Sequence, residues 1–499
     1  MNIDFSSSSK GFQVVKINGI PLHSQYNPLL EAQRFVDGIQ VPFNPKAVII
    51  TGPGLSYTAE FLRKRFPKAI LTAIHFLDKF EEYDSVWDKV FFADQENLSE
   101  RLYNFLGDEV LMSTIFISWK PSESIFSESF SCVWMEMKNA VLKARNVLNT
   151  KSHFSKKWFT NTIKSALYIK TSVYYTKAHC PVVICASGPS LLDSIPLLKK
   201  SRNSFFLIAL SSSLKILTDN HLIPDFVLST DGGFWAKKHL FASLCSYPQI
   251  PLGLPGEAAC PGKILENNLI LPLKYSDGFE NYFYPDLGIE SHEAEANGTV
   301  SGTAVKLALN LTDGEVFFCG LDLAAAKGYQ HSQPNELELF DSSNDWRLSP
   351  KENRISPKGF KNQALEIYNS WFRSQDFGGR VFRLSNNYNY SNNLGQIKDV
   401  NFNYFEVYLK SVSRQKPSLE IKENKTPLLR RIEIIKSILE KNKNNPVWIE
   451  KLFPAEKILL ERSLNQEETV QLKEDLNSKI FTFFEEIREK LCRISIEKA

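Results

Sequence analysis

The chain of 499 residues lacks the marks of several protein classes. Its seven cysteines are scattered and form no C-x-x-C pair, so neither a disulfide framework nor a zinc site built from cysteine pairs is expected. No stretch reaches the roughly 18–20 apolar residues that a membrane span requires. The first residues have neither the basic start nor the apolar run of a signal peptide. These absences predict a cytoplasmic protein with no membrane partner.

A strong excess of charge of either sign is also missing. Lys and Arg total 59 against 56 acidic residues, which gives a formal net charge of +3. That balance provides no electrostatic reason to expect binding to nucleic acid. The length exceeds what one compact core usually holds, so several domains are expected.

What the sequence does contain is an alternation of apolar strands and amphipathic helices, which is typical of parallel α/β sheets. Residues 46–74 and 180–210 share one plan of strand, Gly-Pro turn, helix and second strand. We therefore predict an α/β protein with two tandem Rossmann-like units. The central unit is expected to carry the nucleotide site.

Three segments follow from this pattern. Residues 1–125 begin with short strands around an Asn18-Gly19 turn and continue into the first Rossmann-like unit. Residues 126–410 hold a helical connector and the central nucleotide-sugar domain. Residues 411–499 form a charged, α-helical region, in which an apolar stripe recurs at helical spacing. The stripe either packs against its own protein or docks a helical partner. It consists of Leu429, Ile432, Ile435 and Leu439.

The turn after the strand VVICA is the first candidate site. Ligands of parallel sheets bind at the carboxyl ends of the strands, and helix N-termini attract phosphates. Because Pro189 has no N–H, we expect the donors to be the N–H groups of Gly188, Ser190 and Leu191 together with the hydroxyls of Ser187 and Ser190. Serine and proline also begin ordinary helices, so simple capping is the alternative.

Two more strands end in an aspartate. Asp231 follows FVLS and Asp322 follows VFFC, and each either caps a turn or binds a ribose hydroxyl or a metal. A further polar turn that contains Thr299, Ser301 and Gly302 opens another helix and is a candidate anion or sugar cradle.

A general base is sought among the eight histidines. His331 is the first candidate because it follows the Asp322 strand end and begins a polar stretch, residues 330–360, that we interpret as a long loop or lid. His292 is the second candidate, and a histidine without any role is the alternative. In the first Rossmann-like unit, His75 stands where an acidic ribose ligand would be expected, so that unit is interpreted as structural, without a cofactor.

Taken together, these motifs resemble one family. GPSL at 188–191, LIPDFVLSTD at 222–231, TVSGTAVKLALNL at 299–311 and VFFCGLDLAAAKGYQH at 316–331 resemble the motility-associated factor (Maf) family of flagellin glycosyltransferases. The resemblance extends from about residue 20 to about residue 400. The central part is also similar to bacterial sialyltransferases.

The resemblance implies transfer of a nonulosonic acid (sialic-, pseudaminic- or legionaminic-like) from its CMP ester to Ser or Thr of flagellin, a step needed for flagellum assembly and motility. By matched position, Gly188, Pro189 and Ser190 would meet the CMP phosphate and Asp231 the nucleoside, while Asp322 would shape the same pocket. Ser301 and Gly302 would lie at the donor, and neither a metal nor a cofactor would be required. Flagellin would be the protein partner, docked in part by residues 411–499.

Two other functions stay open. A similar core occurs in an archaeal hydroxymethylpterin pyrophosphokinase, in which case Asp231 and Asp322 would hold Mg²⁺ against ATP phosphates. After Asp322, three alanines (Ala324, Ala325 and Ala326) replace the polar residues of the sialyltransferase pattern. They motivate the third hypothesis, a flagellin-binding factor that has lost its chemistry.

Overall fold

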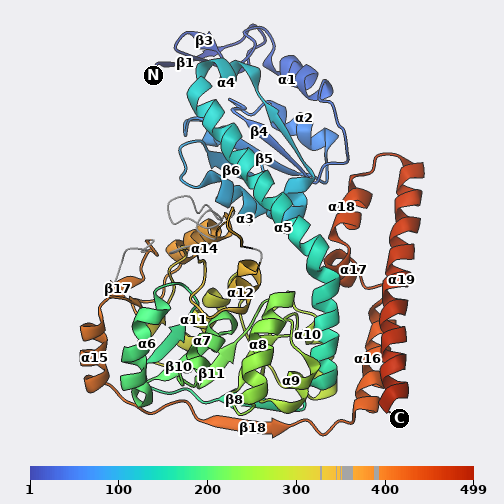
Figure 1. Cartoon of the computed structure of the whole chain (residues 1–499). Helices are drawn as coiled ribbons and strands as arrows, with labels where there is room; N and C mark the ends of the chain where they lie inside the picture. The colour runs from blue at the N-terminus through green and yellow to red at the C-terminus, as the bar shows by residue number, and fades with distance from the viewer. Residues whose placement is uncertain (326–328, 344, 349, 351–362, 387–392, 499) are drawn as a thin grey trace. The chain divides into compact units, whose positions relative to one another are not determined.

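The computed structural model describes residues 1–325, 329–343, 345–348, 350, 363–386 and 393–498 (Figure 1). By its internal contacts the chain divides into two units. Unit 1 comprises Met1–Ser155 with Lys443–Glu486, and unit 2 comprises Lys156–Asn442 with Ile487–Ala499. The three segments expected from the sequence stay a prediction.

Unit 1 contains a hairpin sheet and a parallel sheet. Asn18 and Gly19 adopt positive φ angles of 50° and 80° between β2 and β3, which confirms the predicted turn. The hairpin sheet consists of β1 (Ile3–Ser7), β2 (Gln13–Ile17) and β3 (Ile20–Pro21). The parallel sheet has the order β6 (Lys89–Phe92), β5 (Ile70–His75), β4 (Ala47–Thr51) and β7 (Thr114–Ser118).

Unit 1 also contains helices. Those that belong wholly to this unit are α1 (Pro28–Asp37), α2 (Thr58–Arg65), α3 (Leu98–Met112), α4 (Lys120–Ile125), α17 (Pro446–Leu452) and α18 (Pro454–Arg462). The long helices α5 (Ser127–Tyr168) and α19 (Gln466–Lys498) each contribute residues to both units.

Unit 2 is built on a sheet of eleven strands, parallel except where β18 pairs antiparallel with β8. In sheet order the strands are β17 (Lys398–Val400), β16 (Val381–Leu384), β15 (Val316–Cys319), β9 (Val182–Cys185), β10 (Phe206–Leu210), β11 (Phe226–Leu228), β12 (Leu252–Pro255), β13 (Ile270–Lys274), β8 (Thr171–Tyr175) and β18 (Leu419–Glu423), with β14 (His292–Glu293) beside β13. After β9 the chain adds strands on one side as far as β13, and with β15 it returns to the other side of β9. This reversal is a topological switch point, the place where such sheets bind ligands.

Along the chain, the helices of unit 2 connect these strands or follow the last of them. They are α6 (Leu191–Lys200), α7 (Leu214–Asp219), α8 (Phe234–Ser246), α9 (Gly262–Asn267), α10 (Glu280–Phe283), α11 (Val300–Leu311), α12 (Glu336–Ser342), α14 (Gln363–Ser374), α15 (Phe402–Ser411) and α16 (Leu428–Asn442).

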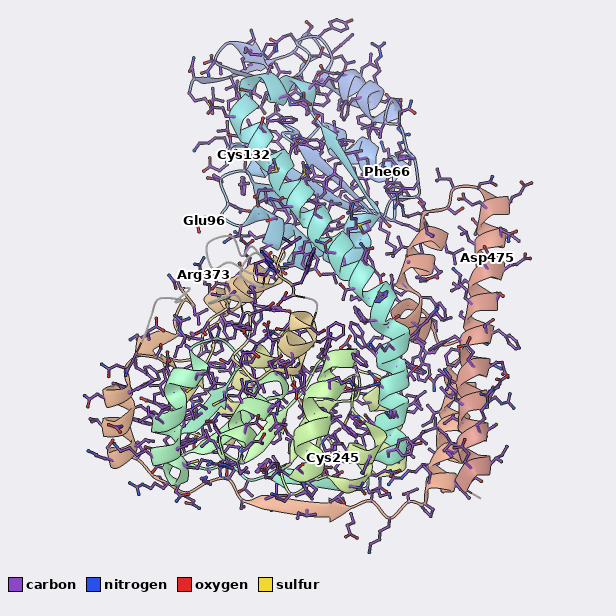
Figure 2. All side chains as sticks on the ribbon, viewed as in Figure 1. Phe66, Glu96, Cys132, Cys245, Arg373 and Asp475 are labelled. Carbon is purple, nitrogen blue, oxygen red and sulfur yellow. The ribbon has the colours of Figure 1, made fainter. Side chains whose placement is uncertain are left out.

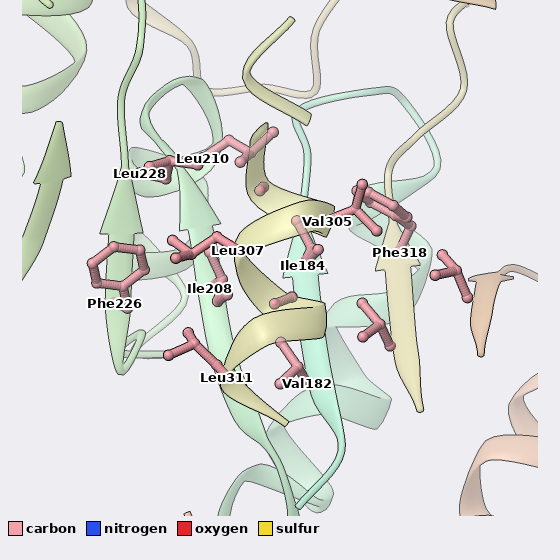
Figure 3. Close-up of a cluster of buried hydrophobic side chains, with 14 of the residues drawn as sticks. Val182, Ile184, Ile208, Leu210, Phe226, Leu228, Val305, Leu307, Leu311 and Phe318 are labelled. Atoms are coloured by element: carbon pink, nitrogen blue, oxygen red, sulfur yellow. The ribbon is translucent and has the colours of Figure 1, made fainter. Parts of the chain in front are cut away.

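Helix α11 packs over the middle of the sheet. Figure 3 shows Val305 near Phe318, and Leu311 near Val182 at the start of β9. The helix therefore runs antiparallel to the strands, and its N-terminus lies at their carboxyl edge. Ile184 and Val305 are fully buried, which explains the near-continuous apolar composition of these strands.

The predicted fold class is confirmed: both units are α/β with parallel sheets. The C-terminal region is helical from Leu428 onward, but it is preceded by β18, because that segment completes the edge of the unit 2 sheet. In the predicted apolar stripe Ile432, Ile435 and Leu439 are buried, whereas Leu429 is exposed.

The seven cysteines are all free thiols. Cys132 on α5 and Cys245 on α8 are exposed (Figure 2). Among the described helices, none combines the length and the apolar character needed to cross a bilayer.

Candidate functional site

Two glycine turns meet backbone to backbone at the switch point. The Gly188 N–H, after β9, donates to the Gly320 carbonyl, after β15, over 2.8 Å. A Cβ on Gly188 would lie 2.3 Å from that oxygen, and one on Gly320 would lie 2.5 Å from the Ala186 oxygen. Gly320 also has φ +71°, which favours glycine. Position 188 therefore requires glycine because the turn after β15 lies too close to leave room for a side chain.

Asp322 caps the start of α6. Its Oδ2 accepts from the Ser190 N–H at 2.7 Å, and its Oδ1 accepts from Ser190 Oγ at 2.5 Å. Burial raises the pKa of Asp322, while the Ser190 bonds and the charge of Arg383 oppose this rise. The carboxylate thus occupies the helix N-terminus where the sequence predicted a phosphate.

The other predicted phosphate donors are also engaged. The Leu191 N–H donates to the Gly188 oxygen at 3.1 Å, and its side chain is fully buried. In this structure all three N–H groups expected to bind phosphate therefore donate within the protein. Gly188 and Pro189 remain partly exposed, so this side of the turn is open to solvent.

A buried arginine supports the Asp322 turn. Arg383 on β16 donates to both carboxylate oxygens of Asp399, at 2.6 and 2.9 Å, and to the Leu321 oxygen at 3.2 Å. Arg383 had no signal in the sequence, because a single arginine in an apolar strand does not reveal which turn it reaches.

Serines after β10 extend the site. Ser212 Oγ donates to Ser187 Oγ at 2.9 Å, and the buried Asn335 amide donates to the Ser212 oxygen at 3.0 Å. These serines were missed. The signal for them was a run of three serines, Ser211–Ser213, directly after an apolar strand next to β9.

The segment of His331 is attached to the same turn. Ser332 donates from its N–H to the Ser187 oxygen at 2.7 Å and from its Oγ to the Gly188 oxygen at 2.6 Å. The structure therefore brings the first candidate base beside the turn after β9.

A buried glutamate holds this segment in place. Glu338 Oε1 accepts the N–H groups of Gln330 at 2.8 Å and His331 at 3.0 Å, and it lies 3.5 Å from His331 Nδ1. Burial raises the pKa of Glu338, but the bonds from His331 and Gln330 outweigh it and lower the pKa overall. The 3.5 Å separation is longer than the hydrogen bond by which a carboxylate orients a catalytic imidazole, so Glu338 holds the His331 backbone rather than its ring.

The loop predicted at 330–360 is partly helical. Helix α12 occupies Glu336–Ser342, and residues 344, 349 and 351–360 lie outside the described residues. Of the alanines after Asp322, Ala325 is buried, and Ala326 is outside the described part of the chain.

Asp231 lies on the same edge but not in the same cluster. It is exposed, and its Oδ1 accepts the Gly233 N–H at 2.7 Å, an ordinary turn contact. Its strand, β11, is three positions from β15 in the sheet, which is roughly 14 Å at the usual strand spacing. Asp231 and Asp322 are therefore separate features.

Helix α14 lies near Asp231 and the start of α11. A Cβ on Gly302 would lie 2.9 Å from the Trp371 ring, and Tyr368 has a pKa raised by burial and by the charge of Asp231. Tyr368 and Trp371 are one helical turn apart and were missed, although their spacing in the sequence indicated a shared face. At the start of α11, the Thr299 oxygen accepts the Gly302 N–H at 3.1 Å.

Two other predicted site residues, Ser301 and His292, lie on α11 and β14. Ser301 is buried in the first turn of α11, at the carboxyl edge of the strands. His292, the second candidate base, is on β14 with its ring 4.9 Å from that of Tyr174, and burial lowers its pKa. The structure does not bring it to the switch point.

In unit 1 the corresponding turn is filled by the protein itself. The Leu55 N–H donates to His23 Nε2 at 2.9 Å, and a Cβ on Gly54 would lie 2.4 Å from that nitrogen. Burial lowers the pKa of His23 to about 3, so its imidazole is neutral. The buried His75 Nε2 lies 2.9 Å from Oδ1 of the partly buried Asp84. The imidazole of His23 thus takes the place that a phosphate has in nucleotide-binding turns.

Metal-binding groups were also sought. Among the described residues, no three His, Cys, Asp or Glu side chains converge to hold a metal ion.

Comparison with known proteins gives matches to part of the chain. Residues 152–328 match a family model described as 6-hydroxymethylpterin diphosphokinase MptE-like. An uncharacterized protein from Treponema pallidum (strain Nichols) is 30% identical over 278 residues, which is 56% of this chain and 61% of the relative. The match therefore spans about three fifths of that relative's length.

A solved structure extends the comparison to nearly the whole chain. The Maf glycosyltransferase from Magnetospirillum magneticum AMB-1 superimposes with a TM-score of 0.52 over 98% of this chain and 90% of its own, at 12% identity. At that identity the similarity concerns the fold. The chain therefore shares the fold of a Maf glycosyltransferase.

Proposed function

We propose that the chain is a glycosyltransferase that moves a nonulosonic acid from a CMP-activated donor to Ser or Thr of flagellin. The observation that carries this proposal is the convergence of the Gly188 turn, Asp322 and the His331 segment at the switch point of the sheet. The fold shared with a Maf glycosyltransferase supports it. The reaction would take place in the cytoplasm, with flagellin as the protein partner.

The donor would lie along the carboxyl edge of the strands. Strands β9 and β11 are two positions apart, roughly 10 Å, which matches the length of a nucleoside monophosphate. The phosphate would lie at the exposed side of Gly188 and Pro189, and the ribose at Asp231. Asp322 would keep the turn in shape by holding Ser190.

The chemistry requires few groups. His331, whose backbone N–H is held by Glu338, would accept the proton of the acceptor hydroxyl as the hydroxyl oxygen forms the bond to the sugar. The bond between the sugar and the phosphate oxygen would break at the same time, and CMP would leave with the bonding electron pair on its phosphate. No metal ion or other cofactor would be needed.

A second candidate is the diphosphokinase, which the match of residues 152–328 favours. It would need Mg²⁺ on ATP, with Asp231 and Asp322 as ligands. Mg²⁺ binds its ligands at about 2.0–2.1 Å, whereas the strands that precede the two carboxylates are roughly 14 Å apart at the usual spacing. This separation favours the transferase. A flagellin-binding factor without chemistry is the third candidate.

Calorimetry of the full chain separates the three. The transferase predicts binding of CMP in the presence of EDTA, and mass spectrometry should show modified flagellin after incubation with a CMP-nonulosonate. Binding of ATP only with Mg²⁺ would favour the diphosphokinase. Flagellin capture without binding of either nucleotide would favour the factor without chemistry.

A further inference from the structure

A cavity lies away from the switch point in unit 2. It has a volume of about 750 Å³, is partly open to solvent and is lined by the segments that follow β13 and β14 and by one face of α11. Small-molecule sites typically measure about 300–1,000 Å³. None of the residues predicted as site residues lines it.

The walls of this cavity are fixed by hydrogen bonds. The Asn281 amide donates to the Tyr275 oxygen at 2.7 Å and to the Gly278 oxygen at 3.0 Å, which holds the turn after β13. Thr303 Oγ1 donates to the Glu295 oxygen at 3.0 Å and ties the segment after β14 to α11. The walls are therefore formed before any ligand arrives.

The charged groups of the lining are only loosely paired. Lys274 Nζ is 3.6 Å from Glu293 Oε1, and Lys306 Nζ is 3.8 Å from Glu295 Oε2. Both distances exceed the usual 2.7–3.2 Å of a hydrogen bond. The side chains of Glu293 and Glu295 are 89% and 64% exposed, so these ion pairs are weak. Ammonium donors and carboxylate acceptors can thus turn toward a ligand.

The composition of the lining selects the ligand class. Two lysines face three acidic residues, which include Asp277, so the lining does not favour a phosphate or a carboxylate. Tyr275, the aromatic ring of the lining, is 5% exposed and offers no open face for a nucleobase. Hydroxyl and amide side chains, such as Ser276 and Asn310, make up much of the remainder. A sugar hydroxyl both donates and accepts, and so it suits this mixture.

We propose that this cavity binds an uncharged saccharide, at a site separate from the switch point. The inference rests on the cavity alone and does not depend on the proposed transferase function.

Saturation-transfer NMR and calorimetry on the full chain test the proposal. The probes are N-acetylglucosamine and maltose, with glucose 6-phosphate and N-acetylneuraminic acid as charged counterparts. We expect a neutral saccharide to bind more tightly than the charged ones, and Lys306→Met to weaken that binding at least fivefold.

Lys215→Met is the matched control, because Lys215 on α7 has a similar exposure (29% against 28%) and a single ion pair, with Asp219. It should bind the saccharide like the wild type, and both variants should melt at the wild-type temperature. The proposal is overturned if no neutral saccharide binds or if the charged probes bind as well as the neutral ones. Equal affinities of the Lys306 and Lys215 variants, or displacement of the saccharide by CMP, would also overturn it.

Discussion

The geometry of the switch point depends on single residues that are packed so closely that no larger side chain fits. Gly188 and Gly320 allow the turns after β9 and β15 to touch, and Asp322 then reaches the Ser190 N–H and hydroxyl. The ligand-facing geometry of the turn is thus a consequence of contacts inside the protein. Substitutions at these positions should change stability and ligand binding together.

Gly188→Ala tests this packing. The added Cβ would meet the Gly320 oxygen at 2.3 Å, so the two turns must separate, at a cost of about 1–3 kcal/mol in unfolding free energy. CMP binding should weaken as well. The control is Gly262→Ala, whose Cβ would have no neighbour closer than 3.5 Å. Denaturant unfolding and calorimetry check both effects, and a Gly188→Ala protein as stable as the control would contradict the packing.

Glu338→Gln tests how the His331 segment is held. Because the pKa of Glu338 is lower in the folded protein than in the unfolded one, its ionised carboxylate stabilises the fold at pH values above the unfolded pKa. This stabilisation is lost as the pH falls through the folded pKa. At pH 7 the loss of the carboxylate should cost about 1–3 kcal/mol of local stability, since hydrogen bonds to charged groups are the stronger ones.

Hydrogen exchange of the Gln330 and His331 amides measures this effect. Exchange should be faster in Glu338→Gln at pH 7, and the difference from the wild type should shrink toward pH 4. Glu366→Gln, on the exposed face of α14, is the control. A difference that persists unchanged at low pH would contradict the role of the ionised carboxylate.

At the scale of elements, the repeated strand-turn-helix pattern predicted both Rossmann-like units, because apolar strands and glycine turns are local features. What occupies each turn was not predictable. His23 reaches the unit 1 turn, and Arg383 and Ser332 reach the unit 2 turns, from parts of the chain distant in sequence. The polar stretch after His331 contains α12, in which the buried Glu338 accepts backbone N–H groups and Glu336 pairs with the His239 imidazole.

The filled turn of unit 1 predicts a pH dependence. Because the pKa of His23 falls from 6.5 to about 3 on folding, its contribution to stability is complete above pH 6.5 and declines as pH falls toward 3. At 1.4 kcal/mol per pKa unit, the loss on lowering the pH from 6.5 to 3 is on the order of 5 kcal/mol.

His23→Gln should remove this acid sensitivity while keeping an acceptor for the Leu55 N–H. Thermal unfolding of the full chain between pH 7 and pH 4 measures it, with exchange of the Leu55 amide as the local readout. His153→Gln, on the exposed part of α5 in unit 1, should retain the wild-type pH dependence. The same slope in the His23 and His153 variants would contradict the burial of a neutral His23.

At the scale of the whole molecule, the C-terminal region is part of the folded protein. The buried Arg431 donates to the Leu167 and Ile169 oxygens at 3.0 and 2.6 Å, and β18 pairs with β8. The sequence predicted the helices but left open whether their apolar stripe packs or docks, since both uses have the same periodicity. Burial of Ile432 and Ile435 favours packing, and docking of flagellin stays a prediction.

Truncation after Lys416 tests this account. The shortened chain would lose β18 and expose the oxygens that Arg431 now binds, so we expect aggregation or a melting temperature lower by 10 °C or more, roughly what a loss of 3–4 kcal/mol produces. Light scattering and calorimetry check it. A soluble truncated protein that melts like the wild type would show that the region is dispensable for folding and would restore the docking hypothesis.

The central claim is that the switch point between β9 and β15 is the nucleotide site. Hydrogen exchange with mass spectrometry, on the full chain with saturating CMP in EDTA, tests it most directly. The account predicts protection in peptides that cover 186–191, 229–233 and 330–333, with no change around Leu55 in unit 1. Protection confined to unit 1 or to the cavity beside α11, or no protection without Mg²⁺, would contradict it.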